Sequence, residues 1–208
     1  MRAPPAWSLF VVAASALATS PVRAQAVDEY RHLGIQLRLV AAPAYLHATQ
    51  ELGPEDTQIE GFGALFGVAL GAMVGERLAL DMDLVLAYAP AADHGVLEDT
   101  IFTALHVGAG LTYWFMPANL YVGASIGAAR SNVENSTVRI GLEVPDNDPT
   151  EVGIGMHLQL GKQFWITRRV GLGATLSLLG SIANNPIGGE DTDRIVVGAA
   201  AGLSFTMN

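Results

Sequence analysis

The segment YWFMPANLYVG, residues Tyr113–Gly123, decides how the rest of the chain is interpreted. Three consecutive aromatic residues run into the tetrapeptide Met-Pro-Ala-Asn at 116–119, and apolar residues resume at once with Leu120. A turn this short and this apolar is a liability in water, because exposed apolar clusters promote association. The segment therefore indicates a tight turn whose two flanks meet an environment other than bulk water.

The sequence on both sides of this turn alternates with a period of two, which is the period of a β-strand. In Leu78–Tyr88 (LALDMDLVLAY) every second residue is a large apolar one, whereas Asp81 and Asp83 fall on the opposite parity. We predict eight strands, each near the length that a tilted membrane strand needs. Besides Leu78–Tyr88 they are Leu33–Ala41, Phe62–Ala72, Leu105–Tyr113, Leu120–Ala128, Val152–Leu160, Val170–Leu178 and Ile195–Met207.

The connections between these strands alternate in length. Short turns are expected at 75–77, 116–118 and 166–169. Long loops are expected at His47–Glu60, Ala89–Asp99, Ser131–Glu151 and Ala183–Asp193. An even number of strands with this asymmetry is typical of bacterial outer-membrane barrels. The sequence thus predicts an all-β fold, an eight-stranded antiparallel up-and-down transmembrane β-barrel with short periplasmic turns and long extracellular loops.

Composition separates this prediction from its alternatives. Half of the residues are hydrophobic, only 15% are charged, and Lys162 is the sole lysine. A soluble barrel of the lipocalin type would expose the second face of each strand to water, and that face holds mostly Gly, Ala and Ser here. The formal charge of −9 argues against a nucleic-acid partner. The absence of cysteine excludes disulfides, thiol catalysis and cysteine-based metal sites.

The N-terminal residues 1–24 are interpreted as a secretory signal peptide. Arg2 precedes the apolar run WSLFVVAASALAT at 7–19, and Pro21 ends that run. Small residues allow cleavage after residue 24 or after residue 26. A short membrane anchor is the alternative, but the run is too short to span a bilayer comfortably. The barrel domain is then expected over residues 27–208.

The chain resembles the small eight-stranded outer-membrane barrels of the OmpA/OmpX/OmpW-like class. The resemblance rests on the alternation, the unequal connections, the YWFMP turn and the closing GLSFTMN, and it covers Val27–Asn208. It implies a location in the bacterial outer membrane and insertion by the barrel-assembly machinery. It also implies contact with outer-membrane lipids and lipopolysaccharide, and it identifies no extracellular partner.

Aromatic residues near the strand ends are expected to form two girdles at the membrane interfaces, where an amphipathic ring is stable. The expected girdle on the long-loop side consists of Tyr45, Phe62, Tyr88 and Phe102. The expected girdle on the short-turn side consists of Tyr113, Phe115, Phe164, Trp165 and Phe205.

Several polar residues share the parity that faces the lumen, and they are the candidate site: Gln36, Arg38, Asp81, Asp83, His106, His157 and Gln159. Arg38 is the only basic side chain expected deep on that face. A charge inside a narrow barrel must be paired, so we expect an internal salt bridge that fills and rigidifies the barrel. An ion pathway or gate is the alternative. No metal or cofactor is expected, because the sequence does not give the distance between the two histidines and so does not define a site.

The sequence is compatible with three functions. The favoured one is a structural or interaction barrel with a mostly plugged lumen and acidic surface loops. A narrow channel for small or apolar solutes is the alternative, suggested by the many glycines of lumen parity. A lipid-modifying enzyme is less favoured, because the lipid-facing residues are Leu, Val, Ala and Ile, and no catalysis is expected. The acidic residues of the expected loops are Glu51, Glu55, Asp56, Glu60, Asp93, Glu98, Asp99, Glu134, Glu143, Asp146, Asp148, Glu151, Glu190, Asp191 and Asp193.

Overall fold

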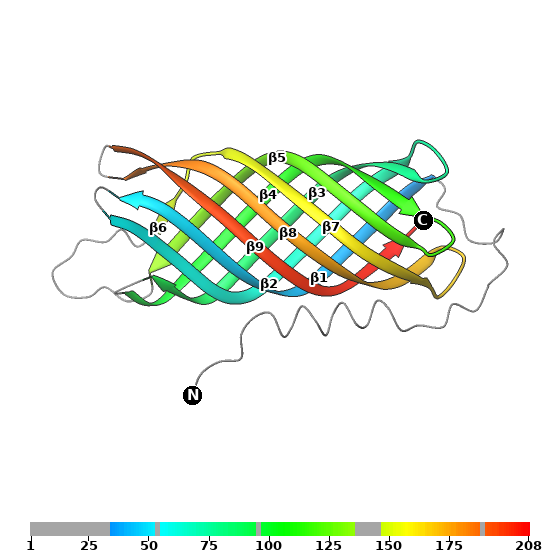
Figure 1. Ribbon diagram of the computed structural model, residues 1–208, viewed down its shortest axis with the longest axis horizontal. Helices are drawn as coiled ribbons and strands as arrows, with labels where there is room; N and C mark the ends of the chain where they lie inside the picture. Colours follow the sequence, from blue (N-terminus) through cyan, green and yellow to red (C-terminus); the bar gives the residue numbers. More distant parts are fainter. Residues whose placement is uncertain (1–33, 53–54, 95–96, 136–146, 188–189) are drawn as a thin grey trace, which may run out of the picture.

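The structure is a computed structural model that describes residues 34–52, 55–94, 97–135, 147–187 and 190–208 (Figure 1). The expected signal peptide at 1–24 and both of its cleavage positions lie outside these residues. Among the described residues, no helix is both long enough and apolar enough to cross a membrane.

The described residues form a closed antiparallel barrel. Each strand of the wall pairs with the next wall strand along the chain, so that β5 pairs with β7, and β9 returns to pair with β1. Eight strands make up the wall, and the short β6 pairs only with the outer end of β5. This confirms the predicted fold. The strands are β1 (Ile35–Leu52), β2 (Glu55–Met73), β3 (Leu78–His94), β4 (Leu97–Phe115), β5 (Leu120–Asn135), β6 (Asn147–Pro149), β7 (Gly153–Trp165), β8 (Val170–Ile187) and β9 (Glu190–Met207).

The strands are longer than predicted, and the difference lies at one end of the barrel. The pairing of β1 with β2 continues to Leu52 opposite Glu55, so most of the loop expected at His47–Glu60 is strand. The loops expected at Ala89–Asp99 and Ala183–Asp193 were likewise too long. Outside the lipid the outward face is polar, so the apolar alternation stops although backbone pairing continues. We call this the hairpin end, and the opposite one, with the turns at 74–77, 116–119 and 166–169, the turn end.

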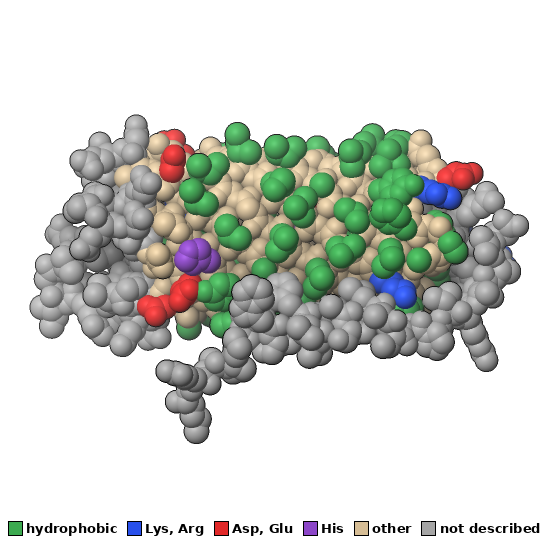
Figure 2. Space-filling view, viewed as in Figure 1, with side chains coloured by type: hydrophobic (Ala, Val, Ile, Leu, Met, Phe, Trp, Pro, Cys, Tyr) green, Lys and Arg blue, Asp and Glu red, His purple; other side chains and the backbone are tan. Residues whose placement is uncertain are grey.

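The outer face of the barrel is apolar. Leu84 on β3 and its cross-strand partner Val107 on β4 are 44% and 41% exposed, and the outward positions of the other strands follow the same pattern. Figure 2 shows hydrophobic side chains spread over the middle of the barrel and charged side chains toward its two ends. The soluble-barrel alternative is therefore wrong, because it requires the large apolar side chains to point inward.

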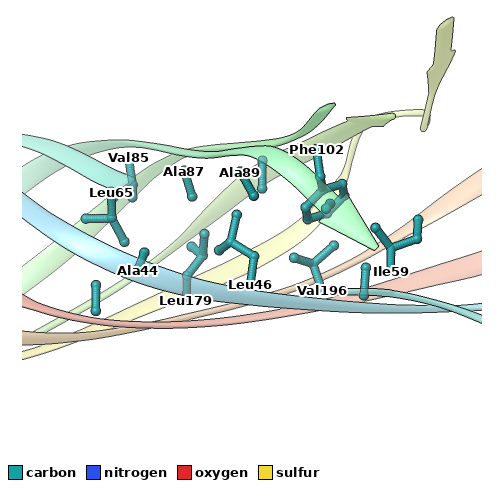
Figure 3. Packing of buried hydrophobic residues seen from close by; sticks show 14 of the residues in the cluster. Ala44, Leu46, Ile59, Leu65, Val85, Ala87, Ala89, Phe102, Leu179 and Val196 are labelled. Carbon is teal, nitrogen blue, oxygen red and sulfur yellow. The ribbon is translucent and has the colours of Figure 1, made fainter. Parts of the chain in front are cut away.

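The lumen holds a layer of buried apolar side chains toward the hairpin end, which we call the apolar layer (Figure 3). One member corrects the sequence analysis. Phe102 was expected in the outer girdle, but it is 0% exposed inside the barrel, on the same parity as Ala104 and His106. Its place near a strand end was misleading, because the period of two alone decides which face a side chain takes. Other members of the layer are Val40, Leu46, Ile59, Leu65, Val85, Val133, Leu179 and Val196.

The glycines that suggested a channel have a packing role. Gly127 on β5 lies opposite Gly108 on β4. A Cβ atom on Gly127 would lie 2.1 Å from the carbonyl oxygen of Val107 and 2.3 Å from the Cα atom of Gly108. Glycine is thus required where strongly coiled neighbouring strands approach each other, and its abundance is no sign of an open lumen.

Candidate functional site in the barrel lumen

Polar side chains from opposite walls of the barrel meet in the lumen on the turn-end side of the apolar layer. An eight-stranded barrel has an interior just wide enough for side chains, so inward residues of non-adjacent strands come into contact. All seven lumen residues expected from the sequence are buried: Gln36 and Arg38 from β1, Asp81 and Asp83 from β3, His106 from β4, and His157 and Gln159 from β7.

Asp81 is at the centre of the first half of this network. Its Oδ1 atom accepts a hydrogen bond of 2.9 Å from Gln36 Nε2, and its Oδ2 atom accepts one from Thr112 Oγ1. Arg38 Nη2 donates to Thr112 Oγ1 at 3.1 Å and lies 3.9 Å from Asp81 Oδ2. The buried carboxylate is therefore balanced by one cation and two polar donors, which such a group requires.

Asp83 is at the centre of the second half of the polar network. Its Oδ2 atom accepts hydrogen bonds from Ser125 Oγ at 2.8 Å and from His157 Nδ1 at 2.7 Å. His106 Nε2 lies 3.1 Å from Ser125 Oγ. A hydroxyl has one hydrogen, and Ser125 gives it to Asp83, so His106 Nε2 is the donor in its contact with Ser125. This arrangement does not activate Ser125 as a nucleophile, because a histidine base would have to accept the hydroxyl hydrogen.

Two aromatic residues close the network at the turn end, and the sequence analysis missed them as site residues. Trp114 and Tyr121 are fully buried, with ring centres 4.9 Å apart. The guanidinium carbon of Arg38 lies 4.8 Å from the centre of the Tyr121 ring, in cation–π geometry. Trp114 lies within the YWFMP segment and Tyr121 four residues after it. Trp114 has the lumen parity of Thr112 on β4 and Tyr121 that of Gly123 on β5, and this was the available signal.

Little free space remains between these groups. The cavity inside the network has a volume of about 10 Å³, which is room for one water molecule. It is lined by both carboxylates, the arginine and one histidine, together with Thr112, Ser125 and Gln159. Among the described residues, no group of three or more His, Asp or Glu side chains is arranged to hold a metal ion.

A second polar contact lies beyond the apolar layer, near the hairpin end. Arg194 Nε and Nη2 both donate to Gln50 Oε1, at 2.9 and 2.7 Å. Arg194 is 1% exposed, so Arg38 is not the only arginine inside the barrel. The sequence analysis left Arg194 between the expected loop at Ala183–Asp193 and the expected strand at Ile195–Met207, and the unpredicted extension of β9 brings it into the wall.

All but one of the remaining aromatic residues expected in the girdles lie on the outer face. Tyr113, Phe115 and Phe164 are exposed near the turn end, where Tyr113 and Phe115 stack edge-to-face at 4.9 Å, and Phe205 is partly exposed beside them. Trp165 is the exception: it has the lumen parity of Gln163 on β7 and its indole Nε1 atom is buried, so its place at a strand end was misleading, as for Phe102. Toward the hairpin end, Phe62 and Tyr88 are exposed, and Tyr45 is partly exposed and packs on Phe62 with ring centres 5.0 Å apart. Tyr45 also donates a hydrogen bond to Glu60.

Comparison with solved structures finds small outer-membrane barrels. Neisserial surface protein A (NspA) is 16% identical, with 84% of this chain and 96% of that chain covered and a TM-score of 0.51. OprG from Pseudomonas aeruginosa is 12% identical, with 86% and 99% covered and a TM-score of 0.45. Ail of Yersinia pestis is 13% identical, with 83% and 99% covered and a TM-score of 0.42. No protein-family model matches the sequence, and neither does any curated protein.

Identities this low show a shared fold and nothing finer. The chain has the fold of the small eight-stranded outer-membrane barrels. The band of apolar side chains on its outer face suits a lipid environment. The barrel therefore resides in the bacterial outer membrane, as the sequence predicts.

Proposed function

We propose that this protein is a structural or interaction barrel with a closed lumen, which presents acidic hairpins at the cell surface. The observation that carries the proposal is the apolar layer across the lumen, with side chains contributed by β1, β2, β3, β4, β5, β8 and β9. An ion that entered this layer would lose its hydration without gaining polar partners, so such a layer opposes conduction.

The polar network supports the same proposal. Arg38 lies 3.9 Å from Asp81, His157 donates a hydrogen bond to Asp83, and the cavity among these groups is the size of one water molecule. A conducting pore needs a continuous path of water, whereas a mutually bonded network of this density resists opening. The role proposed for the network is to hold the strands at a fixed spacing.

The hairpin end supplies the interaction surface. Glu60, Asp93, Glu134, Glu151 and Asp193 are exposed at or near this end. Like charges of this density keep the surface soluble and prevent association between barrels. They also suit a basic extracellular partner or divalent cations that bridge to lipopolysaccharide phosphates. Two of the expected acidic loop residues, Glu143 and Asp146, lie outside the described residues.

No enzymatic activity is part of the proposal. Ser125, the two histidines and Asp83 contain the residue types of a hydrolytic site, but all of them are buried, and the cavity that Ser125, His157 and Asp83 line is too small for a lipid. A substrate would have to reach them through the apolar layer or past the Trp114–Tyr121 pair. Their geometry suits a structural network better than catalysis.

We expect the wild-type barrel to show no steady conductance when it is reconstituted in a planar bilayer. The physical reason is the apolar layer, which leaves no hydrated path for ions. Single-channel recording at several voltages is the measurement. Steady, reproducible conductance in the wild-type protein would refute the closed lumen and favour the narrow channel for small or apolar solutes.

Truncating the apolar layer provides a second, matched test. We expect Phe102→Ala to lower the free energy of unfolding by about 3–5 kcal/mol, because it leaves a cavity in a packed interior. Phe62→Ala removes the same atoms from the outer face, where Phe62 is 62% exposed, and should cost much less. Urea unfolding in lipid vesicles measures both variants. Equal costs for the two variants would mean that the lumen around Phe102 is loosely filled.

A further inference from the structure

A groove interrupts the apolar outer face of the barrel near the turn end. Its volume is about 350 Å³, within the range of small-molecule sites. The groove exists because Ala41 on β1 has large neighbours on both sides, Phe66 on β2 and Leu203 on β9. The next row toward the turn end, Val68, Leu39, Phe205 and Leu172, continues its walls.

The lining of the groove is almost entirely apolar. Its single polar side chain, Ser204, is turned into the barrel, where its hydroxyl oxygen accepts a hydrogen bond from Gln163 Nε2. A concave apolar surface that faces lipid suits a flexible hydrocarbon chain, which can follow its shape and gain dispersion contacts along its length.

A lysine stands beside the groove on the lipid-facing parity. Lys162 on β7 pairs with Ala174 on β8, and Ala174 pairs with Leu203 of the groove wall. Lys162 therefore lies in the same row as Ala41, inside the apolar band. A cation in this band is costly, so such residues mark binding sites or reach toward the interface.

The ammonium group of Lys162 is directed toward the turn end. Its Nζ atom lies 5.3 Å from the ring centre of Phe164, which is two residues nearer the turn and opposite Leu172 of the groove wall. The side chain is 9% exposed, and among the described residues no carboxylate and no hydrogen-bond acceptor pairs with the ammonium. The alkyl part of Lys162 is thus buried while its ammonium reaches the surface at the edge of an apolar groove, where it suits an anion.

A second cation, Arg169, lies farther toward the turn end. Arg169 lies on the exposed turn between β7 and β8, and its carbonyl oxygen accepts a hydrogen bond of 2.9 Å from the backbone N–H of Asn208. Leu172 and Arg169 are three residues apart, which is roughly 10 Å along a strand. The order from the groove outward is thus apolar floor, lysine ammonium, aromatic girdle and arginine.

We propose that this groove binds one anionic glycerophospholipid of the leaflet at the turn end. An acyl chain lies over Ala41 between Phe66 and Leu203, and the phosphate is held by the Lys162 ammonium with Arg169 beside the headgroup. Charge complementarity favours an anionic phospholipid over a second copy of the barrel, because the described outer face around the groove offers no carboxylate to neutralise Lys162. Basic pockets beside membrane-spanning segments recognise anionic headgroups in this way.

Native mass spectrometry of the folded full barrel in detergent tests the proposal, with phosphatidylglycerol and phosphatidylcholine of identical acyl chains as probes. We expect one phosphatidylglycerol to bind more tightly than phosphatidylcholine. Lys162→Gln should weaken phosphatidylglycerol about fivefold, the effect of one basic group near a membrane surface. Ala41→Leu, which fills the groove, should reduce the binding of both lipids.

Matched variants separate the groove from the general surface. Arg77→Gln removes a cation from the exposed turn between β2 and β3, and Ala109→Leu enlarges an outward alanine of β4; neither should change lipid binding. If Ala41→Leu does not fold, Val68→Phe narrows the same groove from β2. The proposal would be overturned if the two lipids bound equally well or if Lys162→Gln left phosphatidylglycerol binding unchanged. Dimers of the barrel in place of a lipid complex would also overturn it.

Discussion

Replacing Leu84 with arginine is expected to block stable insertion of the barrel. Leu84 is 44% exposed on the outer face in the middle of β3, between Val68 and Val107 of the neighbouring strands. A cation at the midplane of a lipid-facing strand costs about 2–4 kcal/mol. The folded fraction, measured as the heat-modifiable band on a gel after refolding into vesicles, should fall accordingly. Val107→Arg, on the paired position, should behave in the same way.

The control for this prediction keeps the new residue and changes only its surroundings. Glu76→Arg introduces arginine on the exposed turn between β2 and β3, where water solvates it, and should fold as the wild type does. If Leu84→Arg and Val107→Arg fold as well as this control, the assignment of the outer face to lipid is wrong.

Replacing Arg38 with alanine is expected to destabilise the folded barrel by about 3–5 kcal/mol, because it leaves a buried carboxylate without its cation. Arg38 is the cation nearest to Asp81, and its guanidinium also packs on Tyr121 and donates to Thr112. Urea unfolding in vesicles, followed by tryptophan fluorescence, measures the loss. Conductance should stay absent, because the apolar layer is untouched.

Two further variants distinguish a dry network from a hydrated one. Arg77→Ala removes an exposed arginine and should leave stability unchanged. Combining Arg38→Ala with Asp81→Asn removes both charges and should recover part of the lost stability, because no unpaired ion remains. The contrary outcome has two parts: the wild-type barrel conducts, and the Arg38→Ala variant is equally stable but more cation-selective. That result would mean that water screens these charges and that the lumen is a channel.

The number of barrel strands, the turn positions and the outer face could be predicted from the sequence. Each of these follows from a local rule: a period of two assigns successive side chains to opposite faces, and short turns join neighbouring antiparallel strands. Leu84 and Asp83 are adjacent in the chain, and the alternation alone correctly sends one to lipid and the other to the lumen. The same rule would have placed Phe102 inside, had its parity been given priority over its nearness to a strand end.

The lengths of the strands could not be predicted in this way. The apolar alternation reports which solvent the outward face meets, and it does not report backbone pairing that continues where that face becomes polar. The segments around Leu52 and Glu55, or Asn185 and Thr192, are therefore paired strand although their composition is that of loops. Arg194 was missed for this reason, and its contact with Gln50 comes from the pairing of β9 with β1.

The partners inside and outside the barrel were decided only by tertiary structure. Asp83 meets His157 across 74 residues of sequence, and Arg38 meets Thr112 across the same separation, because closure of the barrel brings opposite walls together. The groove over Ala41 depends on the register that sets Phe66 and Leu203 beside it. The amino-acid sequence determined which residues face inward and outward, since that needs only the local alternation. Which of them touch depends on strand stagger and closure, which are properties of the whole barrel.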